Sequence, residues 1–143
     1  MLLGNYISQL GSGKRVAVPK KFRSQLGDSC IVAKWYDKCL VLLSEEAWSE
    51  LLQRLTVTET IPTAAVRDTM RFVMGSAFEV SFDSQGRFVL PDTLLGYAGI
   101  KDEVMFLGLG SRIEIWDKSE WETKEQNISE NAGALLEQLA DGK

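Results

Sequence analysis

Few side chains in this sequence could carry enzyme chemistry, and their types exclude the commonest mechanisms. The chain has no histidine, which is the residue used most often as a general base and as a metal ligand. Cys30 and Cys39 are separated by eight residues within apolar stretches, so they form no CxxC pair and no zinc site. We predict two buried thiols in a reducing cytoplasm, and neither a cofactor nor a metal.

Basic side chains gather near the start of the chain. The first 27 residues carry a charge of +5 with no acid, whereas residues 28–143 contain 11 basic and 20 acidic side chains, so that the net charge is −4. Segregation of this kind is typical of proteins that bind a polyanion on one face. A solvated basic loop balanced by acid elsewhere would give the same pattern. The candidate residues are Lys14, Arg15, Lys20, Lys21 and Arg23.

The segment 11–14, with the sequence GSGK, superficially resembles a phosphate-binding loop. That motif would require glycine at position 8 and Ser or Thr at position 15, where this chain has Ser8 and Arg15. An apolar strand is also expected where the motif needs a helix. Because no pair of carboxylates stands out either, we predict that the chain is not an enzyme and has no small-molecule substrate.

A repeat runs through the chain and indicates how these residues are positioned. GKRVAVP (13–19) matches QGRFVLP (85–91) at an offset of 72 residues, which aligns Arg15 with Arg87, and Trp48 meets Trp121 at an offset of 73. A tandem duplication explains this order. The predicted parts are a first unit (5–50), a connecting helical segment (51–75), a second unit (76–122) and an acidic C-terminal tail (123–143). Within the tail, one or two amphipathic turns are expected at 127–143.

Each unit shows the same series of expected elements. An alternating strand is followed by a glycine-containing turn and a short apolar strand that ends at a proline. Two more strands follow, at 30–35 and 39–43 or at 103–108 and 112–116, and helices are expected to begin at Ser44, Ile61-Pro62 and Asp117. Such units are too small to bury their sheets alone, so they should pack about a pseudo-two-fold axis. The predicted fold is mainly β with peripheral helices (α+β).

The motifs also resemble those of a known family. The similarity covers most of the chain to about residue 122 and is most specific in the second unit. It is carried by MLLG, KRVAVPKKFR, CLVLL, RFVMGSA, DSQGRFVLP, AGIKDEVMFLG and IEIWDKSEW. Together these segments resemble the MraZ family, whose members contain two SpoVT/AbrB-type swapped-hairpin units.

This resemblance implies a function. Members of the family are bacterial transcriptional regulators of the division and cell-wall gene cluster. They form homo-oligomeric rings, bind repeated promoter boxes in double-stranded DNA and are cytoplasmic and nucleoid-associated. The basic turn of the first unit carries the family's DNA contact, which places Arg15 first, with Lys14 beside it. Charge and spacing add Lys20, Lys21 and Arg23.

Two further expectations concern the turns. Arg87 corresponds to Arg15, and we expect it to be a structural arginine that bridges to an acid, with Glu79 and Asp83 both nearby. In the first unit, the family's D-x-K-G-R is replaced by GSGKR at 11–15, which removes the acid and exchanges glycine and lysine. This departure keeps an alternative open, a non-catalytic scaffold or antitoxin-type interaction protein of the same fold. No stretch approaches 18 apolar residues, so no membrane partner is expected.

Overall fold

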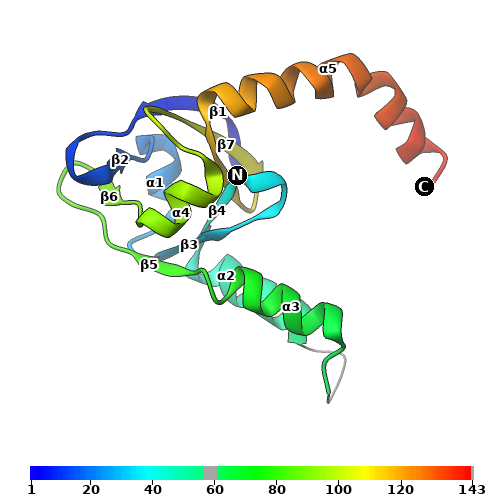
Figure 1. The fold of residues 1–143 in the computed structure, drawn as a ribbon, viewed down its shortest axis with the longest axis horizontal. Helices are drawn as coiled ribbons and strands as arrows, with labels where there is room; N and C mark the ends of the chain where they lie inside the picture. Colours follow the sequence, from blue (N-terminus) through cyan, green and yellow to red (C-terminus); the bar gives the residue numbers. More distant parts are fainter. Residues whose placement is uncertain (57–60, 143) are drawn as a thin grey trace.

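A six-stranded antiparallel sheet with a two-stranded ribbon against one face forms the centre of the molecule (Figure 1). This computed structural model describes residues 1–56 and 61–142. The strand order of the sheet is β1-β7-β8-β4-β3-β5. Its strands are β1 (Leu2–Gln9), β3 (Cys30–Lys34), β4 (Leu40–Ser44), β5 (Phe78–Val80), β7 (Glu103–Gly110) and β8 (Ile113–Asp117). The ribbon pairs β2 (Arg15–Ala17) with β6 (Arg87–Val89).

The strand order is symmetric. If β1, β3 and β4 are exchanged with β5, β7 and β8, respectively, the result is the same strand order read from the other edge of the sheet. The first strand of each half pairs with the other half, since β1 lies beside β7 and β5 lies beside β3. The ribbon obeys the same relation, with Val16 opposite Phe88. Two halves built in this way share one sheet, and neither half has a complete sheet of its own.

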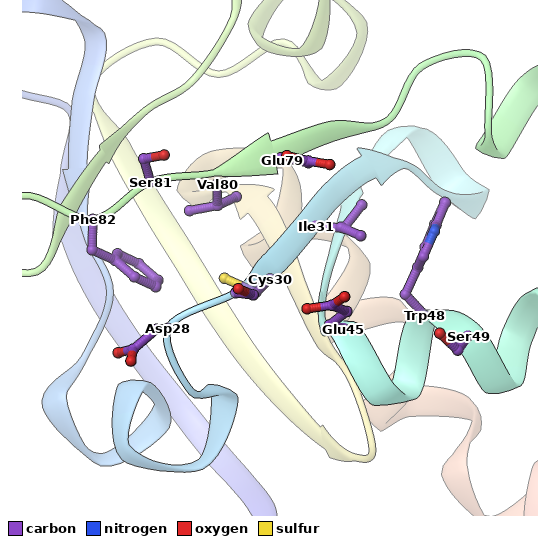
Figure 2. A pocket seen from close by; sticks show the side chains of 11 residues that line it. Asp28, Cys30, Ile31, Glu45, Trp48, Ser49, Glu79, Val80, Ser81 and Phe82 are labelled. Carbon is purple, nitrogen blue, oxygen red and sulfur yellow. The ribbon is translucent and has the colours of Figure 1, made fainter.

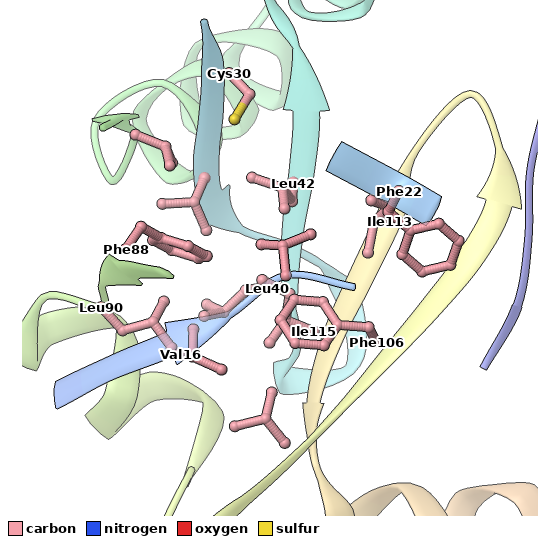
Figure 3. Close-up of a cluster of buried hydrophobic side chains, with 14 of the residues drawn as sticks. Val16, Phe22, Cys30, Leu40, Leu42, Phe88, Leu90, Phe106, Ile113 and Ile115 are labelled. Carbon is pink, nitrogen blue, oxygen red and sulfur yellow. The ribbon is translucent and has the colours of Figure 1, made fainter. Parts of the chain in front are cut away.

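The main core lies between the ribbon and the sheet, because alternate side chains of each strand point to this side. Figure 3 shows Val16, Phe88 and Leu90 facing large side chains of the central strands. The fully buried members from those strands include Leu40, Leu42, Phe106, Ile113 and Ile115. A second cluster on the opposite face is built around Trp35, Val41, Leu43, Met105 and Trp116. The α+β, mainly β, fold class is confirmed.

Helices cover the second cluster, and the predicted helix starts agree well with the structure. Helix α2 (Glu45–Thr56) begins after Ser44, whose Oγ accepts the Ala47 N–H at 3.1 Å. Helix α5 (Lys118–Ala140) begins after Asp117, which accepts the Glu120 N–H at 3.2 Å. Helix α3 (Ala64–Val73) begins slightly later than predicted, because Thr63 provides the cap.

Two features differ from the sequence-based prediction. The structure adds short helices after each proline, α1 (Lys20–Leu26) and α4 (Asp92–Ala98), again 72 residues apart. The tail was expected to have only one or two helical turns, and this was wrong. Helix α5 runs unbroken for 23 residues and extends away from the sheet (Figure 1), which its many Glu, Gln, Leu and Ala residues favour. No helix among the described residues is long and apolar enough to cross a membrane.

Candidate nucleic-acid interface

The first basic turn joins β1 to β2 at one end of the ribbon. It is closed by a hydrogen bond from the Gly11 N–H to the Arg15 carbonyl, with a length of 2.8 Å. Inside the turn, Gly13 and Lys14 both have left-handed backbone, with φ angles of 71° and 60°. Glycine adopts this conformation freely, but a lysine does so only at a cost. The turn therefore holds Lys14 in a strained position at its tip.

Arg15 projects into solvent from this turn. Within the described ranges 1–56 and 61–142, its guanidinium makes no ion pair or hydrogen bond. All five of its N–H donors are therefore available to a ligand, and they form a planar fork that suits guanine or phosphate. An arginine of this kind can donate to a base edge or to a phosphate.

Lys14 differs from Arg15 because its Nζ pairs with the carboxylate of Asp92, the first residue of α4. The side chains are 52% and 76% exposed, and an exposed pair of this kind is weak enough to exchange for another anion. Sequence reasoning missed Asp92. The spacing of charges could not have indicated it, because the contact depends on the pairing of β2 with β6.

The second turn, between β5 and β6, is held together by Asp83. Its N–H donates to the Arg87 carbonyl at 2.8 Å, as Gly11 does in the first turn. One carboxylate oxygen accepts the backbone N–H groups of Gln85 and Arg87, and the other accepts Arg87 Nε, all at 2.9 Å. The backbone N–H of Arg87 is the main cause that holds the pKa of Asp83 below its usual value. The expected pair is present, and the structural role of Arg87 remains a prediction.

The two turns have the same frame but different side chains. At the position of Lys14 the second turn has Gly86, with a φ of 75°. At the position of Asp83 the first turn has Gly11, which offers no carboxylate. The exchange noted in the sequence thus has a structural meaning. It places lysine where the left-handed backbone favours glycine, and it leaves Arg15 without the brace that holds Arg87.

The register of the ribbon separates the two turns. Antiparallel pairing sets Arg15 opposite Val89 and Ala17 opposite Arg87. The first turn therefore lies at one end of the ribbon and the second turn at the other. Each turn lies beside the short helix of the opposite unit: α4 is next to the first turn and α1 is next to the second.

This placement divides the five predicted DNA-binding residues. The Val18 N–H donates to the Gly86 carbonyl at 3.1 Å, and Arg23 Nε donates to the Val18 carbonyl at 3.0 Å. The Arg23 guanidinium also lies directly against Gly86, since a β-carbon there would come within 2.2 Å of Arg23 Cζ. Lys20 and Lys21 are exposed on the same helix. The three basic residues of α1 therefore lie beside the second turn, at the end of the ribbon opposite Arg15.

A cavity of about 660 Å³ near β5 and α2 is the main alternative site (Figure 2). Among the described residues, its charged lining side chains are the carboxylates Asp28, Glu45 and Glu79, and none is basic. Burial raises the pKa of Cys30 to about 11, so this thiol stays protonated and is a poor nucleophile. Across the described residues, no three Cys, Asp or Glu side chains are grouped to hold a metal ion. The lining therefore suits neither a nucleic acid nor nucleophilic catalysis.

Comparison with known proteins identifies the family. The family described as "MraZ protein, putative antitoxin-like" matches residues 73–141. A protein of Acetivibrio thermocellus named "Transcriptional regulator MraZ" is 37% identical over 142 residues, covering 98% of this chain and 97% of its own length. The chain belongs to the MraZ family. Proteins of the same name from Syntrophomonas wolfei and Halothermothrix orenii are 34% and 35% identical, covering 99% and 94% of this chain and 98% and 96% of their own lengths.

The MraZ relatives are named as regulators of transcription and not as enzymes, which agrees with the prediction that this chain is not an enzyme. A solved structure, "The solution structure of PHS018 from pyrococcus horikoshii", aligns with 80% of this chain and 88% of its own. Its sequence identity is 13% and its TM-score is 0.33, which is too low to bear on the fold. The similarity in sequence therefore carries the assignment to the MraZ family.

Proposed function

We propose that this chain is a sequence-specific, DNA-binding transcriptional regulator that acts on the division and cell-wall gene cluster through repeated promoter boxes. The names of its relatives support regulation of transcription. The single observation that carries the DNA contact is the contrast between two equivalent arginines. Arg15 is exposed without an acidic partner among the described residues, whereas Arg87 is held by Asp83 at 2.9 Å.

In this proposal the first turn enters the major groove, as the tips of β-ribbon DNA-binding proteins do. Arg15 forks onto O6 and N7 of guanine, and Lys14 leaves Asp92 to neutralise a phosphate. Base contacts supply sequence preference, and phosphate contacts supply most of the affinity. The proposed DNA-binding residues are Arg15, Lys14, Lys20, Lys21 and Arg23.

The proposal includes a homo-oligomeric ring. A single chain with a net charge of −4 and one free arginine tip would bind DNA weakly. Several chains in a ring, each on one box of a repeated promoter, multiply these contacts through effective concentration. Binding by several chains accounts for the repeated boxes. A regulator that acts on these promoters would be cytoplasmic and associated with the nucleoid.

We also propose that the ring is built from tandem swapped-hairpin units at 5–50 and 76–122, followed by the tail at 123–143. The exchange of β1 and β5 between the halves supports this division. The connecting segment at 51–75 lies partly outside the described residues, at 57–60.

A salt titration tests the DNA-binding proposal. Binding of the intact oligomer is measured on the duplex upstream of its own gene and on a shuffled duplex of the same composition. We expect preference for the native duplex and an affinity that falls steeply with salt. Arg15→Ala should abolish the preference while the mass of the oligomer, measured by light scattering, stays unchanged.

Arg87→Ala is the matched control, because it removes the equivalent arginine from the second turn. It should lower the melting temperature more than it lowers DNA affinity. Loss of the oligomer in Arg15→Ala would contradict the proposal. Weak binding of the wild type to both duplexes, with little dependence on salt, would favour a non-catalytic scaffold or an antitoxin-type protein of this fold. The Lys14–Asp92 pair and the missing acid of the first turn would then explain the loss of DNA binding.

A further inference from the structure

We propose that α1 and the second turn form a second phosphate-binding surface for double-stranded DNA, at the end of the ribbon opposite Arg15. This inference rests on the proposed DNA-binding function and assigns its residues to two separate contacts. Arg15 would read bases at the first turn. Lys20, Lys21 and Arg23 would bind the DNA backbone at the second.

The charges at the two ends of the ribbon differ strongly although the backbone is symmetric. At the first turn, α4 contributes the acid Asp92, which pairs with Lys14. At the second turn, the equivalent position of α1 is Lys20, and Lys21 and Arg23 follow on the same helix. Counting the turns with their adjacent helices, the first end carries Lys14, Arg15 and Asp92, and the second carries Lys20, Lys21, Arg23, Arg87 and Asp83. The larger net positive charge is therefore at the end of the ribbon opposite Arg15.

The geometry holds Arg23 in place for this role. Its Nε donates to the Val18 carbonyl at 3.0 Å. Its guanidinium lies against residue 86, where a β-carbon would come within 2.2 Å of Arg23 Cζ, so glycine at this position leaves the space that the guanidinium occupies. No partner is present for its two terminal nitrogens among the described residues. They can donate to a phosphate without first breaking a bond to the protein, so the arginine is positioned before DNA arrives.

The two lysines suit the backbone of DNA and not its bases. Both are exposed, and neither makes an ion pair within residues 1–56 and 61–142. A lysine ammonium on a flexible stem acts as a point charge, without the planar fork that reads a base edge. The acid Asp28 lies beyond the far end of the same helix, which spans about 9 Å from Lys20 to Leu26 at 1.5 Å per residue. It therefore leaves the basic end of α1 free.

The test is a double variant, Lys20→Gln with Lys21→Gln, in the intact oligomer. Glutamine keeps the helix propensity of lysine and removes only the charge. The salt dependence of binding, plotted as log affinity against log salt, should become less steep by about 1.8 per bound chain, because each neutralised phosphate contributes about 0.9. The ratio of affinities for the native and shuffled duplexes should stay the same, since phosphates carry no sequence.

A matched control removes the same charge elsewhere. Arg54 and Lys124 are exposed on α2 and α5, which contact the face of the sheet opposite the ribbon. Arg54→Gln with Lys124→Gln should leave the slope unchanged. The inference is overturned if the Lys20/Lys21 variant keeps the wild-type slope, if it loses the sequence preference, or if the control variant loses as much slope.

The outcomes separate this inference from the proposed function. One result refutes only the second surface and leaves the proposed function standing. In it, the sequence preference depends on Arg15, but the Lys20/Lys21 variant keeps the wild-type slope. Absence of DNA binding by the wild-type oligomer refutes both proposals. A reduced slope with the preference intact supports two contacts per chain.

Discussion

Replacing Lys14 by glycine should make the protein more stable, although it removes an ion pair. Lys14 has a φ of 60°, and the equivalent position in the second turn is Gly86 with a φ of 75°. A left-handed conformation costs an L-residue about 1–2 kcal/mol, and glycine adopts it without that cost. The substitution therefore relieves local strain at the tip of the first turn.

Two losses oppose this gain. Glycine gives the unfolded chain more freedom, which costs about 0.4–1 kcal/mol. The pair with Asp92 is also lost, but its side chains are 52% and 76% exposed, and such pairs contribute about 0–1 kcal/mol. With the middle of each range, the net gain is about 0.3 kcal/mol, which corresponds to a rise of about 1 °C in melting temperature for a chain of this size.

Lys38→Gly is the matched control. Lys38 lies in η2 (Tyr36–Lys38), between β3 and β4, with a φ of 57°. It makes no ion pair among the described residues, so its replacement should raise the melting temperature slightly more than Lys14→Gly does. Thermal unfolding followed by circular dichroism, at one fixed protein concentration, compares both variants with the wild type.

DNA titration separates the two variants further. Lys14→Gly should reduce the salt slope by about 0.9 per bound chain, because one phosphate contact is lost, and Lys38→Gly should leave it unchanged. A lower melting temperature for Lys14→Gly beside a higher one for Lys38→Gly would refute the reasoning. It would mean that the contact between Lys14 and Asp92 outweighs the backbone strain.

Two other predictions concern the second turn. Gly86→Ala should lower the melting temperature, because it strains a left-handed residue by about 1 kcal/mol and displaces Arg23; Gly96→Ala, in open space on α4, should raise it. Equal effects of the two changes would contradict this. Asp83→Asn should destabilise at neutral pH. Since folding lowers the pKa of Asp83 below 3.8, its stabilisation is complete above that pH and is lost as the pH falls through the folded-state pKa. Urea unfolding at a series of pH values from about 7 downward should show the difference between wild type and variant shrinking as the pH falls through the folded-state pKa of Asp83.

Much of the fold could be predicted from the sequence because the elements repeat with their own local signals. The alternation of Phe78, Val80 and the polar residues between them is typical of a strand, and Ser44 and Asp117 are strong helix caps. The helices α1 and α4 could not be predicted in the same way. Each has only seven residues, which is too short for a clear helical periodicity, and they are stabilised mainly by burying Phe22 and Leu94 in the shared core.

The candidate site divides along the same line. The sequence predicts that Arg87 bridges to a nearby acid, Glu79 or Asp83, and in the structure this local partner is Asp83, at 2.9 Å. The contacts of Lys14 with Asp92 and of Arg23 with Gly86 join residues 78 and 63 positions apart. They depend on the pairing of β2 with β6, which the spacing of charges along the chain does not contain. Charge counting therefore found the basic residues but merged two clusters into one.

The exchange of strands has a consequence for how such a protein can change. Each turn is flanked by the helix of the other half, so the electrostatic surroundings of Arg15 depend on α4, in the second half, as much as on its own turn. Asp92 lowers the positive charge at the first turn, and its counterpart Lys20 raises the charge at the second. If the proposed function holds, a single substitution in one helix would alter one of the two proposed DNA contacts and leave the backbone of both turns intact. The symmetric frame and the asymmetric charges are the basis for proposing that one end of the ribbon reads sequence while the other provides attraction to DNA.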